Sequence, residues 1–450
     1  MLLNFTVENW MSYRDEASLS MVASLERQHA STLAKIPGYR SKKALPVAAV
    51  YGGNASGKTG LFRAISALKH MVIGDVGVDD VLPVIPFMLE RGSSLKPTVL
   101  DVTFLAGKTV YRYVLEVTQD KVSYESLEHV LEKGNVDIFE REKIADDGYE
   151  YVFNEDIFGS LEFVGFVGKS TRSNQTFLGN AVAQNVLRLK EAYDWFADTL
   201  QLVGVESHAW TFANAAGTRE GFFEYASGAL SRLDTGICGL SGERVDLDAL
   251  PKSAKIRKRV AQLKENELMT LVAEKAAGDY GFEMITVHVE DDQPVVERMR
   301  TLHKGLDGEV RSFGLGMESS GTQRLMGLLP MLFDLQDPDG SVGSKVYVVD
   351  ELDRCLHTML TARLVEDFLK TCDPSTRKQL LFTTHVLLLM DQSLMRRDEM
   401  YIAQRDANGR SELLSLAEFE GIRYDKDLVR SYLDGRFGGI PMLREEVSRG

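Results

Sequence analysis

The chain has 450 residues, of which 44% are hydrophobic and 26% charged, and its net charge is −14. This composition is typical of a globular protein of two or three domains and excludes a low-complexity or repeat architecture. The acidic balance does not indicate nucleic-acid binding over the whole surface. Three widely spaced cysteines exclude a disulfide framework and a C-x-x-C metal site, and they fit a reducing compartment such as the cytoplasm.

The N-terminal residues predict a strand with one buried face, because Leu3, Phe5 and Val7 alternate with polar residues. A second strand is expected in "SLSMVAS". The start of the chain lacks the basic and apolar regions of a signal peptide, and the longest apolar runs are too short for a membrane span. We therefore expect a cytoplasmic protein with no membrane partner.

A glycine-rich loop follows the short buried run "LPVAAVY" and precedes apolar residues at helical spacing. From Gly52 to Thr59 the spacing is G-x-x-x-x-G-K-T, the pattern of a phosphate-binding loop. An ordinary glycine-rich turn is the alternative, which the flanking strand and helix disfavour. The residues of this loop expected to bind ATP are Gly52, Asn54, Ala55, Ser56, Gly57, Lys58 and Thr59.

The chemistry of this loop follows from its residue types. Glycines let backbone N–H groups turn toward an anion, and the helix N-terminus adds its positive dipole end. Lys58 is expected to contact the β and γ phosphates, and Thr59 to hold Mg²⁺ through its hydroxyl. After the helix, "TVLDVTFLAGKTVYRYVLEV" predicts a hairpin with its turn at Ala-Gly-Lys.

The middle of the chain, residues 126–300, has mainly helical patterns. In its basic run, Ile256, Val260 and Leu263 have helical spacing, so a solvated helix face is favoured over a local nucleic-acid groove. The last third returns to short buried strands beside helices. We predict an N-terminal ATPase lobe over 1–125, a mainly helical insertion over 126–300 and a C-terminal ATPase lobe over 301–450.

Charged and polar residues follow two buried strands of the last third. Asp350 and Glu351 follow "VYVV", at the edge where α/β sheets bind ligands. Asp350 is a candidate Mg²⁺ ligand and Glu351 a candidate for polarising an attacking water. A helix N-cap is the alternative for this pair, but a phosphate loop in the same chain favours catalysis. His385 ends "KQLLFTTH", where it can contact a γ-phosphate, although a capping or packing role is commoner for a lone histidine.

A run of small and hydroxyl residues, "ESSGTQR", precedes the strongly apolar "LMGLLPMLF". Serine, glycine and threonine at a helix start make an anion site, and a simple capping motif is the alternative. Ser319 and Gly321 are therefore candidate ATP-binding residues.

Taken in order, the phosphate loop, "ESSGTQR", "DELDRCLH" and "TTH" resemble the ABC-type ATPases, relatives of RecF, SMC and the overcoming-lysogenization-defect proteins. "NASGKT", "LDTGI", "ESSGTQR" and "RFGGIP" more closely resemble the bacterial AAA-15-type ATPases of anti-phage defence, such as the ATPase subunit of PARIS-type systems. The resemblance implies an α/β fold: an ABC-type P-loop ATPase head of mixed and antiparallel sheets with flanking helices.

The resemblance also implies residue roles. Residues 319–322 would be the signature loop that completes the γ-phosphate site of a partner subunit, and residues 354–357 would cross the dimer interface. His385 would be the catalytic switch histidine. The chain departs from the pattern at Cys355, where serine is common, and at Thr358, where proline is common. No Q-loop glutamine follows the first helix, and "VIPFMLE" occupies that region.

The chain lacks the sequence features that characterise several related classes of ATPase and GTPase. The insertion has no sustained heptads of the SMC and Rad50 type, and no N-K-x-D guanine motif indicates a GTPase. The segment after His385 is short for the metal nuclease of overcoming-lysogenization-defect proteins. Its acidic residues are expected in a hairpin and in solvated helices; examples are Asp391, Asp398, Glu399, Asp406 and Glu412.

Two functions remain open. One is slow ATP hydrolysis in a head-to-tail homodimer, with a higher assembly left open, that controls a separately encoded toxic effector, a nuclease, in antiviral abortive infection. The other is a RecF-like DNA-repair ATPase that clamps DNA. The acidic net charge makes nucleic acid the less favoured partner. ATP and Mg²⁺ are expected in either case.

Overall fold

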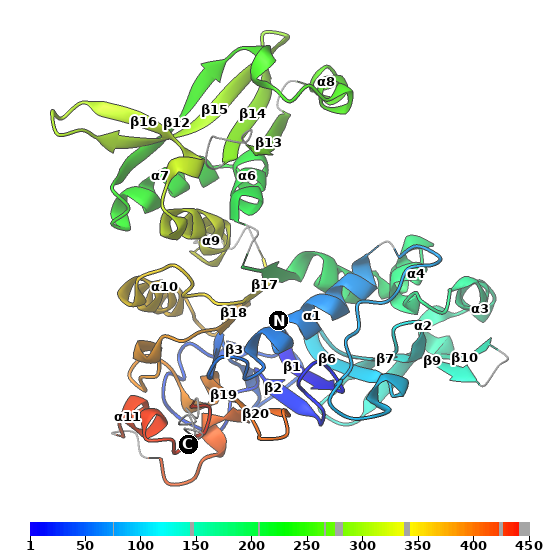
Figure 1. Ribbon diagram of the computed structural model, residues 1–450. Coiled ribbons are helices and arrows are strands. Elements are labelled where there is room, and N and C mark those ends of the chain that lie inside the picture. The colour runs from blue at the N-terminus through cyan, green and yellow to red at the C-terminus, as the bar shows by residue number, and fades with distance from the viewer. Residues whose placement is uncertain are drawn as a thin grey trace, which may run out of the picture. The chain divides into compact units, whose positions relative to one another are not determined.

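The computed structural model describes residues 1–74, 76–144, 148–205, 208–264, 267–274, 282–336, 343–422 and 426–440. The chain divides into two compact units (Figure 1). Unit 1 comprises Met1–Leu202, Ser341–Leu352 and Ala362–Gly450, and unit 2 comprises Val203–Gly340 and Asp353–Thr361.

An antiparallel sheet of unit 1 has the strand order β10-β9-β8-β7-β6-β1-β2. The strands are β1 (Leu2–Glu8), β2 (Ala17–Ser20), β6 (Thr98–Ala106), β7 (Thr109–Val117), β8 (Val122–Val130), β9 (Asn135–Ile144) and β10 (Gly148–Phe153). The predicted first strand and hairpin are confirmed, with Ala106 paired to Thr109 across the predicted turn.

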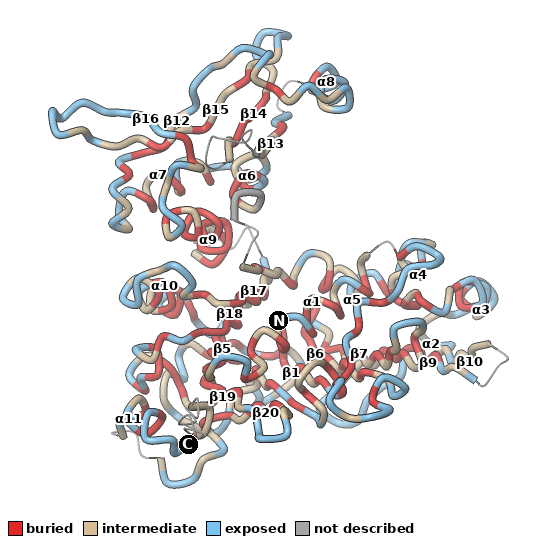
Figure 2. Tube along the Cα trace, in the orientation of Figure 1, coloured by how far each residue is buried: buried red, intermediate tan, exposed pale blue. Residues whose placement is uncertain are grey.

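A second, mostly parallel sheet has the order β11-β17-β18-β5-β19-β20. Its strands are β5 (Val47–Tyr51), β11 (Leu200–Val203), β17 (Lys345–Val349), β18 (Lys378–Thr383), β19 (Met400–Arg405) and β20 (Ser411–Ser415). Every residue of β5 and β18 is buried, as Figure 2 shows for the centre of this sheet. Strands buried on both faces read as continuous apolar runs, which explains why "VAAVY" and "KQLLF" were recognisable.

Helix α1 (Lys58–Ile73) buries Leu61, Ile65 and Leu68 in the core that both sheets of unit 1 share. The other helices of this unit are α2 (Glu155–Phe158), α3 (Leu161–Ser170), α4 (Phe177–Ala183), α5 (Lys190–Asp194) and α11 (Leu428–Leu433), and α10 (Thr358–Lys370) lies mostly in it. The short strands β3 (Ala34–Lys35) and β4 (Lys43–Ala44) form a separate pair.

Unit 2 has its own antiparallel sheet, of order β12-β15-β14-β13, with β16 paired to β15. The strands are β12 (Ile237–Val245), β13 (Leu268–Glu274), β14 (Phe282–Glu290), β15 (Gln293–Lys304) and β16 (Val310–Gly314). Its helices are α6 (His208–Thr218), α7 (Phe222–Arg232), α8 (Ala254–Val260) and α9 (Ser320–Gln336). No helix in the described part of either unit has the length and apolar character needed to cross a bilayer.

The α/β class with mixed and antiparallel sheets is confirmed, but a mainly helical insertion over 126–300 is wrong. Residues up to 202 belong to unit 1, and β8, β9 and β10 extend its antiparallel sheet. The rest contains the strands of unit 2. The strands were missed because their faces are weakly apolar: β10 buries no residue fully, and in β15 arginine and glutamate interrupt the valine and methionine residues without regular alternation.

Candidate nucleotide-binding site

Three neighbouring parallel strands of unit 1 bring the predicted catalytic segments to one edge of a sheet. In the order β17, β18, β5, Val349 pairs with Phe382, and Thr383 pairs with Val50. The segments that follow these strands therefore start side by side. Ligands bind in open α/β sheets at this carboxyl edge.

The loop between β5 and α1 depends on two glycines. Gly52 and Gly57 have φ angles of +150° and +116°, which side-chain-bearing residues rarely adopt. A Cβ on Gly52 would lie 2.3 Å from the carbonyl oxygen of Ala403, and one on Gly57 would lie 2.8 Å from Ser411 Oγ. Ala55 also has a positive φ of +60°. The loop is thus held in a conformation that its surroundings impose.

The lysine of the loop lies close to the loop's own backbone. Lys58 is only 7% exposed, and its Nζ donates hydrogen bonds to the carbonyl oxygens of Gly52 and Gly53 at 2.8 and 2.9 Å. Ser56 Oγ, beside it, is buried without a hydrogen-bond partner in the described structure. A buried cation and an unsatisfied hydroxyl at one loop suit an anionic ligand that accepts hydrogen bonds.

The start of α1 is clamped by two aromatic residues that the sequence analysis did not single out. Trp10 Nε1 donates to the carbonyl oxygen of Gly60 at 2.8 Å, and the Tyr13 hydroxyl donates to that of Gly57 at 3.1 Å. Burial raises the pKa of Tyr13 well above its ordinary value, so this donor keeps its proton. Nothing in "ENWMSY" signalled this role, because both contacts depend on tertiary packing.

The "RFGGIP" segment also reaches the loop, through a backbone hydrogen bond from Gly53 N–H to the carbonyl oxygen of Gly439 at 2.9 Å. Gly438 and Gly439 have φ angles of +72° and +74°. Pro441 of the same motif lies outside the described residues.

The acidic pair at the end of β17 is held by one threonine of β18. The hydroxyl of Thr383 donates to Asp350 Oδ1 at 2.8 Å and accepts the backbone N–H of Glu351 at 2.7 Å. Glu351 has a positive φ of +49°, a conformation that is costly for a glutamate and often found at functional sites. Thr383 is therefore a positioning residue for both acids. It stands two residues before His385, in the "TTH" run whose histidine alone was considered.

The predicted magnesium ligands lie together. Thr59 Oγ1 is 3.4 Å from Asp350 Oδ1, and Asp350 is buried at 4% exposure. A hydroxyl and a carboxylate are hard oxygen donors of the kind that Mg²⁺ prefers beside phosphate oxygens. The residues present therefore fit a magnesium ion at this position.

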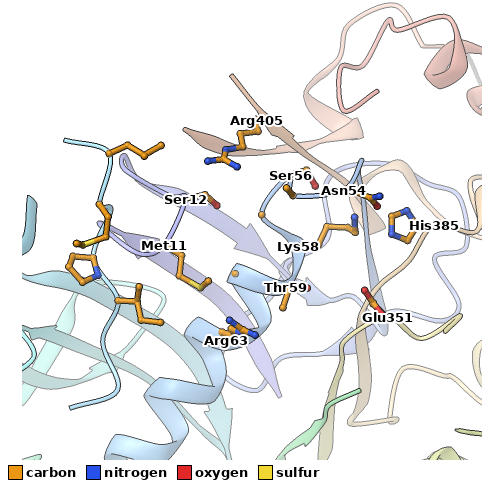
Figure 3. A pocket seen from close by; sticks show the side chains of 17 residues that line it. Met11, Ser12, Asn54, Ser56, Lys58, Thr59, Arg63, Glu351, His385 and Arg405 are labelled. Atoms are coloured by element: carbon orange, nitrogen blue, oxygen red, sulfur yellow. The ribbon is translucent and has the colours of Figure 1, made fainter. Parts of the chain in front are cut away.

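A cavity of about 580 Å³ opens over the loop (Figure 3). Figure 3 shows Asn54, Lys58 and His385 close together on one side of it, with Glu351 beneath them and Arg405 and Met11 across the pocket. Of the predicted residues, the cavity is lined by Asn54, Ala55, Ser56, Gly57, Lys58, Thr59, Glu351 and His385.

Apolar residues from the "VIPFMLE" region form part of the same cavity wall. Ile85, Met88 and Leu89 line it and are themselves 44%, 69% and 64% exposed. The region that follows the first helix, where the ABC-type pattern has its Q-loop glutamine, thus contributes an apolar surface. A polar floor with an apolar wall can accept a ligand that has both phosphates and a flat base.

The remaining predicted ATP-binding residues, Ser319 and Gly321, lie in unit 2 at the start of α9. Ser319 Oγ accepts the N–H of Thr322 at 3.1 Å, which is a helix N-cap. A Cβ on Gly321 would lie 2.6 Å from the carbonyl oxygen of Cys355. The capping alternative is therefore borne out within the chain, while a role toward phosphate stays a prediction.

Two of the C-terminal acids are not solvated, contrary to the expectation from the sequence. Asp398 and Glu399 are 5% and 1% exposed. Asp398 forms a 2.7 Å ion pair with the buried guanidinium of Arg396, whose backbone N–H donates to Glu399. Buried carboxylates with such partners are structural, and the predicted hairpin of β19 and β20 follows them.

The fold and this cavity define a P-loop nucleotide-binding protein. More particularly, the chain belongs to the AAA_21 family, described as "AAA domain, putative AbiEii toxin, Type IV TA system", whose model matches residues 47–391. The match begins at β5 and ends six residues after His385, so it includes every predicted site residue. No curated protein matches the chain significantly.

Two solved structures are similar along nearly their whole length. One is the SMC head domain from Thermotoga maritima, at 14% identity and a TM-score of 0.39, with 92% of this chain and 98% of that chain covered. The other is an SmcHead bound to the C-winged helix domain of ScpA, at 12% identity and a TM-score of 0.43, with 93% and 99% covered. Both scores are low, so these likenesses carry no argument about function.

Proposed function

We propose that the protein binds ATP in the cavity over the Gly52–Thr59 loop and hydrolyses it slowly. One observation carries this proposal: Lys58, Glu351 and His385, which follow three different strands, line a single cavity. The triphosphate would lie along the loop, with its β and γ phosphates at Lys58 and the N-terminus of α1. The base would rest on the apolar wall that includes Met88 and Leu89.

The chemical step transfers the γ-phosphoryl group to water. Glu351 orients the water whose oxygen forms the new bond to phosphorus, and accepts the proton that this water loses. The bond between phosphorus and the β–γ bridging oxygen breaks, and that oxygen leaves as part of ADP. His385 donates a hydrogen bond to the γ-phosphate and loses that contact when phosphate departs. Thr383 keeps Asp350 and Glu351 in place throughout.

Thr59 and Asp350 would hold Mg²⁺, which neutralises charge on the phosphate oxygens when bound. Thr59 supplies a hydroxyl and Asp350 a carboxylate that Thr383 orients. A hydroxyl-bearing residue is needed directly after Lys58 because its oxygen would bind the metal ion together with Asp350.

The separation of binding from hydrolysis tests this function. Lys58→Ala should lose ATP affinity, because the cation at the β and γ phosphates is removed. Glu351→Gln should bind ATP and lose turnover, because only the water-orienting group is changed. The measurements are anisotropy of a fluorescent ATP and phosphate release, with the exposed Glu420→Gln as the matched control. Hydrolysis by Glu351→Gln at the parental rate would show that Glu351 is wrongly assigned.

We further propose that two chains act head-to-tail, each supplying Ser319 and Gly321 to the ATP of the other. The chain carries one phosphate loop and one "ESSGTQR" run, and C₂ symmetry would provide two complete sites. Ser319→Arg should then block hydrolysis and ATP-induced dimers while ATP binding by single chains persists. A fully active protein that stays monomeric with ATP would contradict this arrangement.

The same ATPase would control a separately encoded toxic effector, a nuclease, in anti-phage defence of the AAA-15 and PARIS type. The family's description, with its reference to a toxin and a type IV system, supports a toxin context but names no partner for this chain. A partner that binds the ATP-bound and ATP-free states unequally is shifted by nucleotide. Co-purification with the product of the adjacent gene, in parental and Glu351→Gln backgrounds, followed by phage challenge, tests this role. Absence of both binding and protection would contradict it.

A further inference from the structure

Helix α8 of unit 2 presents an unusual concentration of positive charge for so acidic a chain. The segment between Leu250 and Lys264 contains no aspartate or glutamate. Its apolar residues Ile256 and Val260 pack into a small core with β13, β14 and β15, so the helix is anchored on one side. The exposed cations of this segment, here called the α8 cations, are Lys252, Lys255, Arg257, Lys258, Arg259 and Lys264.

Among the described residues, the α8 cations differ from arginines on the neighbouring strands, which form ion pairs. On the neighbouring strands, Arg244 pairs with Glu290, Arg298 with Glu283, and Arg300 with Glu243. The structure shows no ion pair or hydrogen bond from an α8 cation side chain within its described residues. Ion pairs within the chain therefore account for the cations on the strands, but they do not account for the concentration of positive charge on α8.

Two of the α8 cations border a cavity. Lys255 and Arg259 stand four residues apart on one face of the helix, and both line a space of about 340 Å³ between α6, α8 and β13. Among the described residues that line this cavity there is no carboxylate. Thr270 also lines it, and its Oγ1 is buried without a hydrogen-bond partner in the described structure.

This arrangement costs stability unless an anion is bound. Like charges at positions i and i+4 of a helix repel each other, and a buried hydroxyl without a partner loses hydration. A phosphate group would relieve both, since its oxygens accept hydrogen bonds from guanidinium, ammonium and hydroxyl donors. The α8 cations that do not line the cavity would then contact further phosphate groups of the same ligand.

We propose that the α8 cations and this cavity bind the phosphate backbone of a nucleic acid, independently of the ATP site. Cations repeated along a short helix match a ligand whose charges repeat regularly along its length, as phosphates do. Acidic side chains of a protein have no such regular spacing. None of the described residues that line the cavity is aromatic, and few of them can read base edges, so we expect binding independent of sequence.

The test measures binding of the full chain to labelled duplex DNA, single-stranded DNA and RNA by fluorescence anisotropy over a series of salt concentrations. The variant Lys255→Glu/Arg259→Glu removes the cavity cations. The control, Lys108→Glu/Lys133→Glu, makes the same charge change in exposed turns of unit 1. We expect the α8 variant to bind at least ~10-fold more weakly than the control, with a log–log salt slope smaller by roughly 1–2.

Further variants separate the possible outcomes. Thr270→Val should weaken binding less and leave the salt slope unchanged, because a hydroxyl carries no charge. Lys58→Ala should bind nucleic acid normally, which keeps this site distinct from the ATP site and lets either proposal fail alone. Equal binding by the α8 variant and its control, or no binding by the parent at low salt, would overturn the proposal. Equally strong competition by poly-glutamate would also overturn it and indicate an acidic protein as ligand.

Discussion

The cavity over the Gly52–Thr59 loop and the cavity beside α8 are both bordered by cations, and they are built in different ways. In unit 1, Lys58 is 7% exposed, and its ammonium donates to two carbonyl oxygens of a loop with positive φ angles. In unit 2, Lys255 and Arg259 project from an exposed helix and have no partner in the described structure. The first site is defined by backbone geometry and the second by side-chain charge.

This difference predicts how the two sites respond to change. A backbone site recognises a small ligand in one geometry and tolerates few substitutions. A site made of exposed cations depends on salt and loses affinity gradually as charges are removed. The same contrast applies to stability, because charges buried in unit 1 maintain its fold whereas the α8 cations do not.

The largest expected effect is on stability. Glu125 and Arg141 of unit 1 are both fully buried, 3.4 Å apart, and Glu125 also accepts the N–H groups of Phe177 and Leu178 at the start of α4. Glu125→Ala should lower the free energy of unfolding by about 3–5 kcal/mol, because it leaves a buried guanidinium unpaired. Lys258→Ala on α8 should change the free energy of unfolding, measured by chemical denaturation, by less than about 0.5 kcal/mol. Similar losses in both variants would remove the contrast.

The second-largest effect is expected at the backbone of the proposed ATP site. Gly57→Ala should weaken ATP binding by roughly 100-fold, because a methyl group at a φ of +116° would lie 2.8 Å from Ser411 Oγ. Gly60→Ala, three residues on within α1, is the control, since its methyl group would make ordinary contacts, with the Tyr13 ring at 3.4 Å and Met11 Sδ at 4.0 Å. Fluorescent-ATP titration compares the two variants. Tolerance of Gly57→Ala would mean that the loop conformation does not matter for binding.

A smaller effect is expected from the residue that positions the acids. Thr383→Val should lower kcat by about 10–100-fold and leave the affinity for ATP without Mg²⁺ nearly unchanged, because it removes hydrogen bonds to Asp350 and Glu351. Thr383→Ser keeps the hydroxyl and should retain most of the activity. Parallel losses in both variants would indicate a packing role instead.

The smallest expected effect concerns pH. Burial raises the pKa of Glu399 from 4.5 to about 8, so folding favours its neutral form. That contribution to stability is fully present below the unfolded-state value and is lost as pH rises through about 8. Glu399→Gln stays neutral, so it should unfold a few degrees above the parent at about pH 9 and show a smaller difference at about pH 5. Equal differences at both values would contradict the assignment.

Local sequence patterns predicted most of the residues that the fold brings to the cavity of unit 1, while their role toward ATP stays a prediction. The loop from Gly52 to Thr59, the buried strands beside it and the positions of Asp350, Glu351 and His385 depend on residues adjacent in the chain. Thr383 was missed because its role arises from the parallel pairing of β17 and β18. Trp10 and Tyr13 were missed because they reach α1 only after the antiparallel sheet has formed.

The strands of unit 2, and β8 to β10 in unit 1, were poorly predictable for a different reason. Their faces are only partly buried, so apolar alternation is weak and charged residues interrupt it, as in "VVERMRTLHK" of β15. The helical spacing of Ile256 and Val260 did predict α8. It could not predict the cavity beside α8, because that cavity also needs residues of α6 and β13.

The most direct test of the ATP-site proposal is a structure of the protein with Mg²⁺ and a non-hydrolysable ATP analogue. We expect the β and γ phosphates along residues 55–59 and the oxygens of Thr59 and Asp350 next to the metal ion. The Nζ of Lys58 should have moved from the carbonyl oxygens of Gly52 and Gly53 to the phosphates. A nucleotide bound elsewhere, or Lys58 unchanged with the analogue present, would contradict this proposal.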